Sequence, residues 1–353
     1  MHKPVSHRGA ISNATGRFER YSAEAFDDGW GREEDLPPLR TEVAVDATRT
    51  IITRNTSPDV PFDRSINPYR GCEHGCIYCF ARPTHAFLGL SPGLDFETRL
   101  FAKPDAARLL EQELSNPRYR PAVLAIGTNT DPYQPIERER RIMRNCLEVL
   151  AAFNHPVMIT TKGHLVTRDL DILVPMAAKG LAAVGISVTT LDRDLCRKLE
   201  PRAPVPAMRL DAIRQLSQAG VPVSVMAAPM IPFVTDHELE RILEAARQAG
   251  ATGAAYILLR LPDEVKELFA QWLDTHFPQR AAHVMSLMVQ QRGGRAYDAQ
   301  WGVRFKGTGA HADLLAQRFA LAVKRFGFTD RHVALETGLF KRPPRPGDQM
   351  ALF

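Results

Sequence analysis

The 353-residue sequence has few cysteines, five in all, and no long apolar run. No stretch approaches the roughly 20 consecutive apolar residues that a membrane-spanning helix requires. The residues from Met1 to Gly9 include no apolar core of a secretory signal. These absences argue against a membrane protein and give no sign of an oxidising compartment. We therefore expect a cytoplasmic protein with reduced thiols and no membrane partner.

The composition is that of an ordinary soluble protein, with 44% hydrophobic and 24% charged residues, but its charge is uneven. The formal net charge is +5, and the segment from Arg280 onward has twelve lysines and arginines against five acidic residues. The basic character thus belongs to the C-terminal region. It indicates either an anionic partner such as nucleic acid or a solvated surface.

Three of the five cysteines, Cys72, Cys76 and Cys79, fall within eight residues. In a reducing compartment, cysteines this close together are typical of metal or redox ligands. Three thiolates bind a metal centre but leave one coordination position open. Cys146 and Cys196 stand alone in the sequence, where a cysteine is usually a buried apolar thiol.

Two metal centres are compatible with the triplet. A structural zinc would need a fourth ligand, for which His74 and His85 are candidates. Zinc sites usually pair two CxxC-type knuckles, however, and no second knuckle follows. The spacing therefore favours an iron–sulfur cluster over zinc.

Hydrophobic patterning divides the chain into three parts. Residues 1–59 are polar and irregular and predict an N-terminal extension, in which 41–45 and 50–53 could form a hairpin. Residues 60–279 alternate short apolar strands with amphipathic helices. Residues 280–353 form the basic C-terminal region, with a helix expected from about residue 311 to 326.

The middle part predicts six βα units, hence an α/β fold of the incomplete (β/α)6 TIM-barrel type with terminal extensions. Its first strand leads into Cys72, and a helix is expected where Leu239 begins an apolar face with the period of a helix. In such folds the loops after the strands converge on one mouth, where chemistry takes place. The other predicted strands are 123–126, 157–161, 184–188, 223–227 and 255–259.

The predicted strand ends are unusually polar. The second strand is followed by the loop 127–137, the third by Lys162, and the fourth contains Ser187. Glu200 and Arg202 form an acid–base pair further on. Each residue alone is compatible with turn or capping chemistry, but several on one rim favour a functional site.

The CxxxCxxC loop with an aromatic residue, Tyr78, before its last cysteine resembles the motif of the radical S-adenosylmethionine (SAM) superfamily, as does its position after the first strand. Residues 65–82, followed by the run Thr-Asp-Pro-Tyr-Gln-Pro at 130–135, are similar to the branch related to spore photoproduct lyase. Uncharacterised members of that branch are often labelled DNA repair photolyases.

The resemblance implies a [4Fe–4S] cluster on Cys72, Cys76 and Cys79, with its open iron bound by SAM. An electron from a donor such as flavodoxin or ferredoxin would then cleave SAM to a 5′-deoxyadenosyl radical, which abstracts hydrogen from an unidentified substrate. Gly71 and Gly75 would let the loop wind tightly around the cluster.

The family's site residues carry over only in part. Tyr78 would lie near the adenine, Lys162 would pair with the methionine carboxylate, and Ser187 would bind ribose. The usual Gly-Gly-Glu is absent, so the amine contact falls to Thr130 or Asp131. Glu200 and Arg202 would contact ribose, methionine or substrate, or form a structural ion pair.

One departure from the branch concerns the substrate. Spore photoproduct lyase carries a cysteine hydrogen donor just before its version of the Thr-Asp loop, whereas residues 127–131 contain none. Reversal of a thymine dimer is therefore disfavoured.

Basic, aromatic and glycine residues mix at 290–297 and 301–309, which suits phosphate contacts and base stacking but also a plain loop. The competing hypothesis is accordingly a non-catalytic, zinc-dependent nucleic-acid-binding protein.

Overall fold

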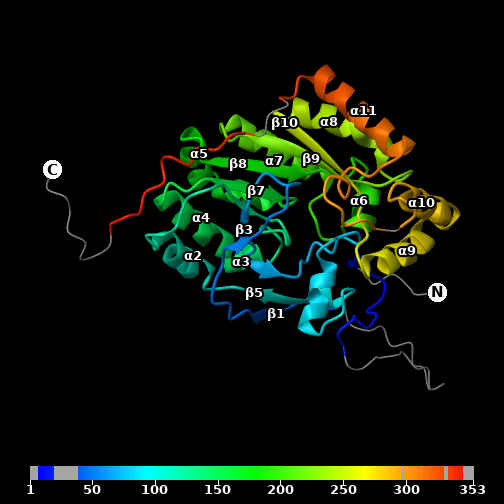
Figure 1. Ribbon diagram of the computed structural model, residues 1–353, viewed down its shortest axis with the longest axis horizontal. Helices are drawn as coiled ribbons and strands as arrows, with labels where there is room; N and C mark the ends of the chain where they lie inside the picture. Colours follow the sequence, from blue (N-terminus) through cyan, green and yellow to red (C-terminus); the bar gives the residue numbers. More distant parts are fainter. Residues whose placement is uncertain (1–6, 20–38, 296, 330–332, 345–353) are drawn as a thin grey trace.

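The computed structural model describes residues 7–19, 39–295, 297–329 and 333–344. Its centre is a seven-stranded sheet in the order β10-β9-β8-β7-β6-β3-β2 (Figure 1). All neighbours from β3 to β10 are parallel, and β2 pairs antiparallel with β3 at the edge. Six parallel strands thus follow one another across the sheet in sequence order, as the six predicted βα units require.

The main sheet consists of β2 (Thr53–Arg54), β3 (Arg64–Ile66), β6 (Leu124–Ile126), β7 (Val157–Thr161), β8 (Ala182–Ser187), β9 (Val223–Met230) and β10 (Gly253–Leu258). All six predicted strands of the middle part are present, with ends shifted by at most a few residues. Strands β3, β6 and β8 are buried along nearly their whole length, as is typical of parallel strands that are covered on both faces.

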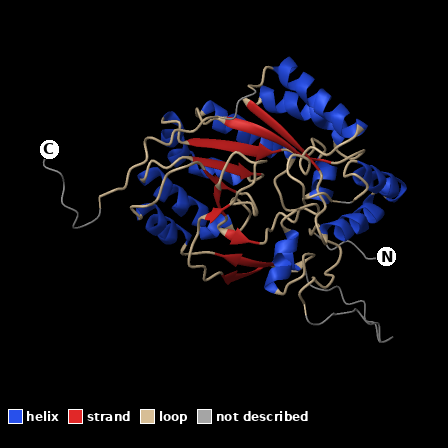
Figure 2. Ribbon diagram, viewed as in Figure 1, coloured by secondary structure: helices blue, strands red, loops and turns tan. Residues whose placement is uncertain are grey.

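Helices follow the strands and pack around the sheet (Figure 2). The 3-10 helices are η1 (Arg82–Leu88), η2 (His164–Asp169) and η3 (Asp236–Glu238). The α-helices are α1 (Asp95–Thr98), α2 (Ala106–Ser115), α3 (Glu137–Arg140), α4 (Ile142–Ala152), α5 (Leu170–Ala178), α6 (Arg193–Leu199), α7 (Pro206–Gln218), α8 (Leu239–Gln248), α9 (Val265–His276), α10 (Pro278–Gln290) and α11 (Ala310–Phe326).

Helix α8 has the predicted apolar face, because Leu239, Ile242, Leu243 and Ala246 are all fully buried. Thr235 and Glu238 have the spacing of a capping box, but the Thr235 side chain makes no cap hydrogen bond. The Thr235 hydroxyl instead accepts a hydrogen bond from the backbone N–H of Ile231 at 2.9 Å and stabilises the preceding turn.

The predicted hairpin of 41–45 and 50–53 is wrong. The first patch is β1 (Glu42–Val45), which pairs parallel with β5 (Arg99–Ala102) in a separate sheet of order β1-β5-β4. Its third strand is β4 (Tyr69–Arg70). The second patch enters the main sheet as β2. Two β-branched patches close in sequence therefore pair with different strands in different sheets.

The described part of the N-terminal extension packs against the cysteine loop. The backbone N–H groups of Gly9 and Ala10 each donate to the carboxylate of Glu97 at 2.9 Å. Parts of both predicted extensions, residues 1–6, 20–38, 296, 330–332 and 345–353, lie outside the described residues.

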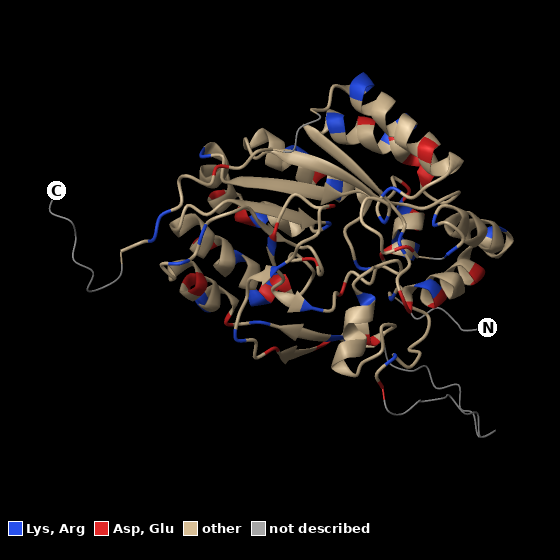
Figure 3. Cartoon of the chain, viewed as in Figure 1, with Lys and Arg blue, Asp and Glu red and all other residues tan. Residues whose placement is uncertain are grey.

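In the C-terminal region α11 occupies the predicted place, but Leu314 is 53% exposed rather than on the apolar face, where Leu315, Ala322 and Val323 are buried. Both basic and acidic residues occur along the ribbon here (Figure 3). Arg318 pairs with Glu240 at 2.6 Å.

Arg292 was a candidate phosphate contact, yet its side chain is buried and donates to the carbonyls of Leu259, Val303 and Arg304. Its role is structural. Among the helices that the structure describes, none is long and apolar enough to cross a membrane.

Candidate functional site

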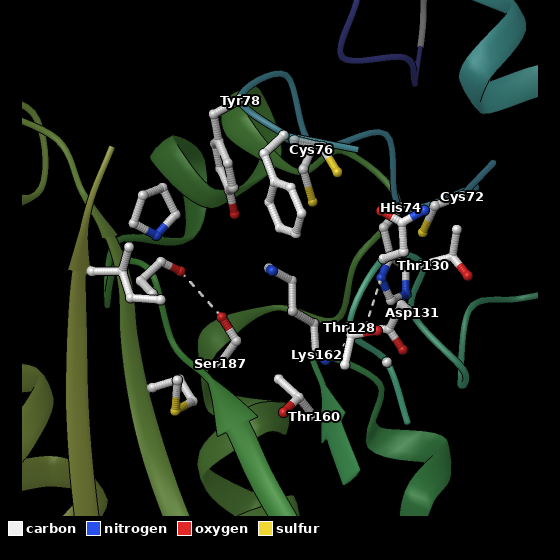
Figure 4. A pocket seen from close by; sticks show the side chains of 18 of the residues that line it. Cys72, His74, Cys76, Tyr78, Thr128, Thr130, Asp131, Thr160, Lys162 and Ser187 are labelled. Atoms are coloured by element: carbon white, nitrogen blue, oxygen red, sulfur yellow. Dashed lines mark hydrogen bonds and ion pairs between the residues drawn. The ribbon is translucent and has the colours of Figure 1, made fainter. Parts of the chain in front are cut away.

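A pocket opens at the carboxyl ends of the parallel strands, where the loops of six βα units meet (Figure 4). Its empty volume, open mouth included, is about 950 Å³. Eight of the predicted site residues line it: Cys72, Cys76, Tyr78, Cys79, Thr130, Asp131, Lys162 and Ser187. The topology thus brings together side chains that are more than 100 residues apart in sequence.

The cysteine loop winds tightly, as its glycines predict. Gly71 and Gly75 have φ values of 74° and 66°, which favour glycine. A Cβ at Gly71 would lie 2.5 Å from Leu100, and one at Gly75 would lie 2.6 Å from the carboxylate of Glu97. A side chain at either position would therefore force the loop out of shape.

A buried ion pair between Arg82 and Glu97 fixes this loop from behind. The two side chains are fully buried and 2.5 Å apart. Arg82 also donates to the carbonyls of Gly75 and Cys76, at 3.1 and 2.9 Å. A buried charge is tolerated where such pairing and hydrogen bonding satisfy it. Arg82 ends the recognised motif, but the role of Glu97 left no signal in the sequence.

The chemistry of the three thiols suits a bound cluster. Cys72 and Cys76 are buried, and burial raises the pKa of the Cys76 thiol to about 12 and that of Cys72 well above its ordinary value. A metal centre would offset the free-energy cost of ionising these buried thiols, since it binds them as thiolates. Among the described residues, no group of three Cys, His, Asp or Glu side chains is close enough to hold a single metal ion.

His74 and His85, the candidate fourth ligands of a zinc site, occupy different places. His74 lines the pocket, with its Nδ1 3.3 Å from the carboxylate of Asp131. His85 is buried against Phe96, and its Nε2 lies 2.9 Å from the carbonyl oxygen of Arg99.

The loop after β6 carries Thr130 and Asp131, whose polar atoms are already engaged. Asp131 accepts hydrogen bonds from the hydroxyl of Thr161 at 2.5 Å and from the backbone N–H of Lys162 at 2.7 Å. Burial alone would raise the pKa of Asp131, but the charge of His74 and these hydrogen bonds lower it below its usual range. Thr130 donates to the carbonyl of Tyr69 at 3.0 Å.

Lys162 and Ser187 reach the pocket from the ends of β7 and β8. Lys162 extends into the middle of the pocket, with its Nζ 5.8 Å from the centre of the Tyr78 ring and 4.0 Å from the carboxylate of Glu200. Although burial opposes the charge, the negative groups of Cys76 and Glu200 raise the pKa of Lys162. Ser187 donates to the carbonyl of Ala228 at 3.1 Å.

Glu200 and Arg202 do not line the pocket and do not pair with each other. Glu200 lies behind Tyr78, accepts hydrogen bonds from Tyr78 and Thr189, and pairs with the buried Arg209. Arg202 pairs with Glu73 at 2.8 Å. Arg209 lies in the first turn of α7 and was not predicted, because no motif in the sequence marks it.

Cys146 and Cys196 are buried outside the pocket lining, as expected. Phe80 and Arg260 line the pocket but were also missed. Arg260 directly follows the predicted strand 255–259, so the strand-end rule that selected Lys162 would have found it.

The Radical SAM superfamily model matches residues 66–246 of this chain. The chain belongs to the radical SAM superfamily. It is therefore a radical SAM enzyme whose reaction is open. The matched segment begins at the last residue of β3 and ends in α8, so it contains the cysteine loop and the four parallel strands β6 to β9.

Relatives of this radical SAM protein include an uncharacterised protein of Mycobacterium tuberculosis (strain H37Rv), 38% identical over 230 residues, which cover 65% of this chain and 68% of the relative. An uncharacterised protein of Methanocaldococcus jannaschii is 27% identical over 173 residues, covering 49% of this chain and 62% of the relative.

The fold is similar to that of spore photoproduct lyase. A structure of that enzyme complexed with dinucleoside spore photoproduct has a TM-score of 0.58 and 16% identity, covering 80% of this chain and 79% of the lyase chain. The likeness therefore concerns the fold.

Proposed function

We propose that this radical SAM enzyme binds a [4Fe–4S] cluster through Cys72, Cys76 and Cys79 and uses it to cleave SAM reductively to a 5′-deoxyadenosyl radical, which takes hydrogen from the substrate. The observation that carries the proposal is that all three thiols line one pocket together with a cation, hydroxyl groups and an aromatic ring at the strand ends. When bound, the cluster supplies the electron for this cleavage.

The chain's own residues bind and orient SAM. The ammonium group of Lys162, central in the pocket, suits the methionine carboxylate, and the ring of Tyr78 suits the adenine. Ser187 contributes a hydroxyl for the ribose. The methionine amine is a hydrogen-bond donor. In this scheme Thr130 and Asp131 are its acceptors. Both carboxylate oxygens of Asp131 already accept bonds, so it takes part through remaining lone pairs.

Glu200 acts as a positioning residue in this scheme. Its Oε1 accepts a hydrogen bond from the Tyr78 hydroxyl and attracts Lys162, so one carboxylate oxygen sets the geometry of two SAM-binding groups. Arg202 holds Glu73 in the cysteine loop and contributes to the shape of that loop.

The sheet is best understood as an incomplete (β/α)6 TIM-type barrel whose mouth excludes water from the radical. A one-electron donor such as flavodoxin or ferredoxin would reduce the site, in keeping with a cytoplasmic enzyme. We also propose that the chain divides into an N-terminal extension (1–59), the barrel (60–279) and the basic C-terminal region (280–353). Nucleic acid is a candidate substrate or partner in this proposal.

Anaerobic purification tests the proposal. We expect brown protein whose broad visible absorbance is lost in Cys76→Ala and kept in Cys146→Ala, because Cys146 is buried outside the pocket. With dithionite and SAM, the wild type should form 5′-deoxyadenosine and methionine. Colourless protein with stoichiometric zinc, or a loaded protein that neither binds nor cleaves SAM, would contradict it.

A further inference from the structure

Arg260 is a pocket cation that the scheme for SAM does not use. It follows β10, the strand at the edge of the sheet far from β6 and β3, and lines the pocket beside Cys79 and Phe80. Lys162 follows β7, so two intervening strands, β8 and β9, separate the ends from which the two cations extend.

In the part of the chain that the structure describes, no carboxylate balances Arg260. Within residues 7–19, 39–295, 297–329 and 333–344, its guanidinium makes no ion pair and no side-chain hydrogen bond, whereas its neighbour Arg304 pairs with Asp59 at 2.6 Å. Burial, together with the positive charges of Arg304 and Arg292, lowers the pKa of Arg260 to about 10. An uncompensated cation in a partly desolvated place is costly, and an anionic ligand would remove that cost.

Two aromatic rings hold the guanidinium. Its central carbon lies 4.4 Å from the ring centre of Phe80 and 4.8 Å from that of Phe305. Such contacts use the flat faces of a guanidinium and leave the N–H groups at its edge free to bind a two-oxygen group. The rings therefore orient Arg260 without using up its donors.

The C-terminal region supplies one side of this arrangement. Buried Arg292 donates to the carbonyls of Leu259, Val303 and Arg304, and the carbonyl of Phe305 accepts the N–H of Leu258 at 2.9 Å. These bonds attach the segment 303–305 to the end of β10. This explains why a basic, aromatic segment far along the chain contacts Arg260 beside the pocket.

We propose that Arg260, held between Phe80 and Phe305, binds an oxyanion group of the substrate, a phosphate or a carboxylate, on the side of the pocket away from Lys162. This inference rests on the proposed function, since it takes the Lys162 side to be occupied by SAM. An oxyanion site at Arg260 implies that the substrate is an anionic molecule.

Calorimetric titration of the anaerobically reconstituted enzyme with inorganic phosphate, and separately with acetate, tests the site. We expect one site per chain, and the anion that binds more tightly identifies the preferred group. In Arg260→Gln the Kd should rise about tenfold or more, the loss expected when a charge-assisted hydrogen bond is removed. Phe80→Leu and Phe305→Leu should raise it about two- to fivefold. Arg318→Gln, which removes one positive charge outside the pocket, should leave it unchanged.

Repeating the titration with saturating SAM shows whether the oxyanion bound by Arg260 belongs to the substrate or is the carboxylate of SAM. Unchanged anion binding supports a substrate site. Loss of anion binding with SAM, together with weakened SAM binding by Arg260→Gln, would assign Arg260 to the carboxylate of SAM and overturn the proposal. So would an absence of anion binding to the wild type, or binding that Arg260→Gln does not weaken. SAM binding and cleavage by the wild type in the same preparations report on the proposed function separately, because the anion site can fail while the loaded protein still binds and cleaves SAM.

Discussion

Glu200 and Arg209 form an ion pair that is closed off from solvent directly behind the pocket, with exposed fractions of 0% and 1%. The same carboxylate accepts the hydroxyl protons of Tyr78 and Thr189 in hydrogen bonds. One buried charge therefore links α7 to the cysteine loop and to the end of β8. Burial opposes its ionisation, but Arg209 and Lys162 lower the pKa of Glu200 to about 2.

The substitution Glu200→Gln should lower the free energy of unfolding by about 3–5 kcal/mol at neutral pH, because it leaves Arg209 buried without a counter-charge. Urea titration of the cluster-free protein measures this loss. The exposed Asp105→Asn should change the free energy by no more than about 0.5 kcal/mol.

The same pair predicts a pH dependence. Since the pKa of Glu200 is lower in the folded protein than in the unfolded chain, its contribution is present above about pH 4.5 and is lost as the pH falls toward 2. The stability difference between wild type and Glu200→Gln should therefore shrink over that range. A difference that stays constant down to pH 2 would show that the carboxylate is not the titrating group.

His155 predicts a second pH effect in another part of the molecule. It is buried, its Nε2 lies 2.8 Å from the hydroxyl of Tyr119, and burial lowers its pKa from 6.5 to about 4. The unfolded chain binds a proton in this interval and the folded protein does not, so the stability is complete above pH 6.5 and falls toward pH 4.

In His155→Gln this part of the pH dependence, about 3 kcal/mol across the interval, should disappear. Thermal or urea unfolding at half-unit pH steps measures it. If wild type and variant lose stability in parallel between pH 6.5 and 4, His155 is not responsible.

Lys162→Met should weaken SAM binding about 10- to 100-fold while the visible absorbance of the cluster stays, because the substitution removes a cation but no thiol. Equilibrium dialysis against labelled SAM measures the affinity. Lys179→Met, at an exposed lysine that donates to Asn154, is the matched control and should bind SAM as the wild type does. Equal affinities for all three proteins would remove Lys162 from the site.

Gly9→Ala should reduce the amount of cluster per chain, although residue 9 holds no ligand. A Cβ at Gly9 would lie 1.8 Å from the carbonyl oxygen of Gly75, so the N-terminal segment and the cysteine loop could not both keep their places. The ratio of visible to protein absorbance after reconstitution measures this. Gly185→Ala, whose Cβ would meet nothing closer than 3.5 Å, should load normally.

The sequence predicted what depends on local pattern. The six parallel strands, the apolar face of α8 and the positions of Lys162 and Ser187 at strand ends follow from hydrophobic period and strand order. The partners of Glu200 could not be predicted, because Arg209 is nine residues away on a helix and pairs only after α6 and α7 have packed. For the same reason β1 was assigned to a hairpin. Its partner β5 lies more than 50 residues along the chain.

The contact of Gly9 and Ala10 with Glu97 also bears on how the proposed cluster would be loaded. The N-terminal segment and the Arg82–Glu97 pair lie against the cysteine loop, and the three thiols line the pocket. Under the proposed function, iron and sulfide would therefore reach the thiols through the same mouth that admits SAM and the substrate. Cluster loading would then have to precede the binding of SAM and substrate.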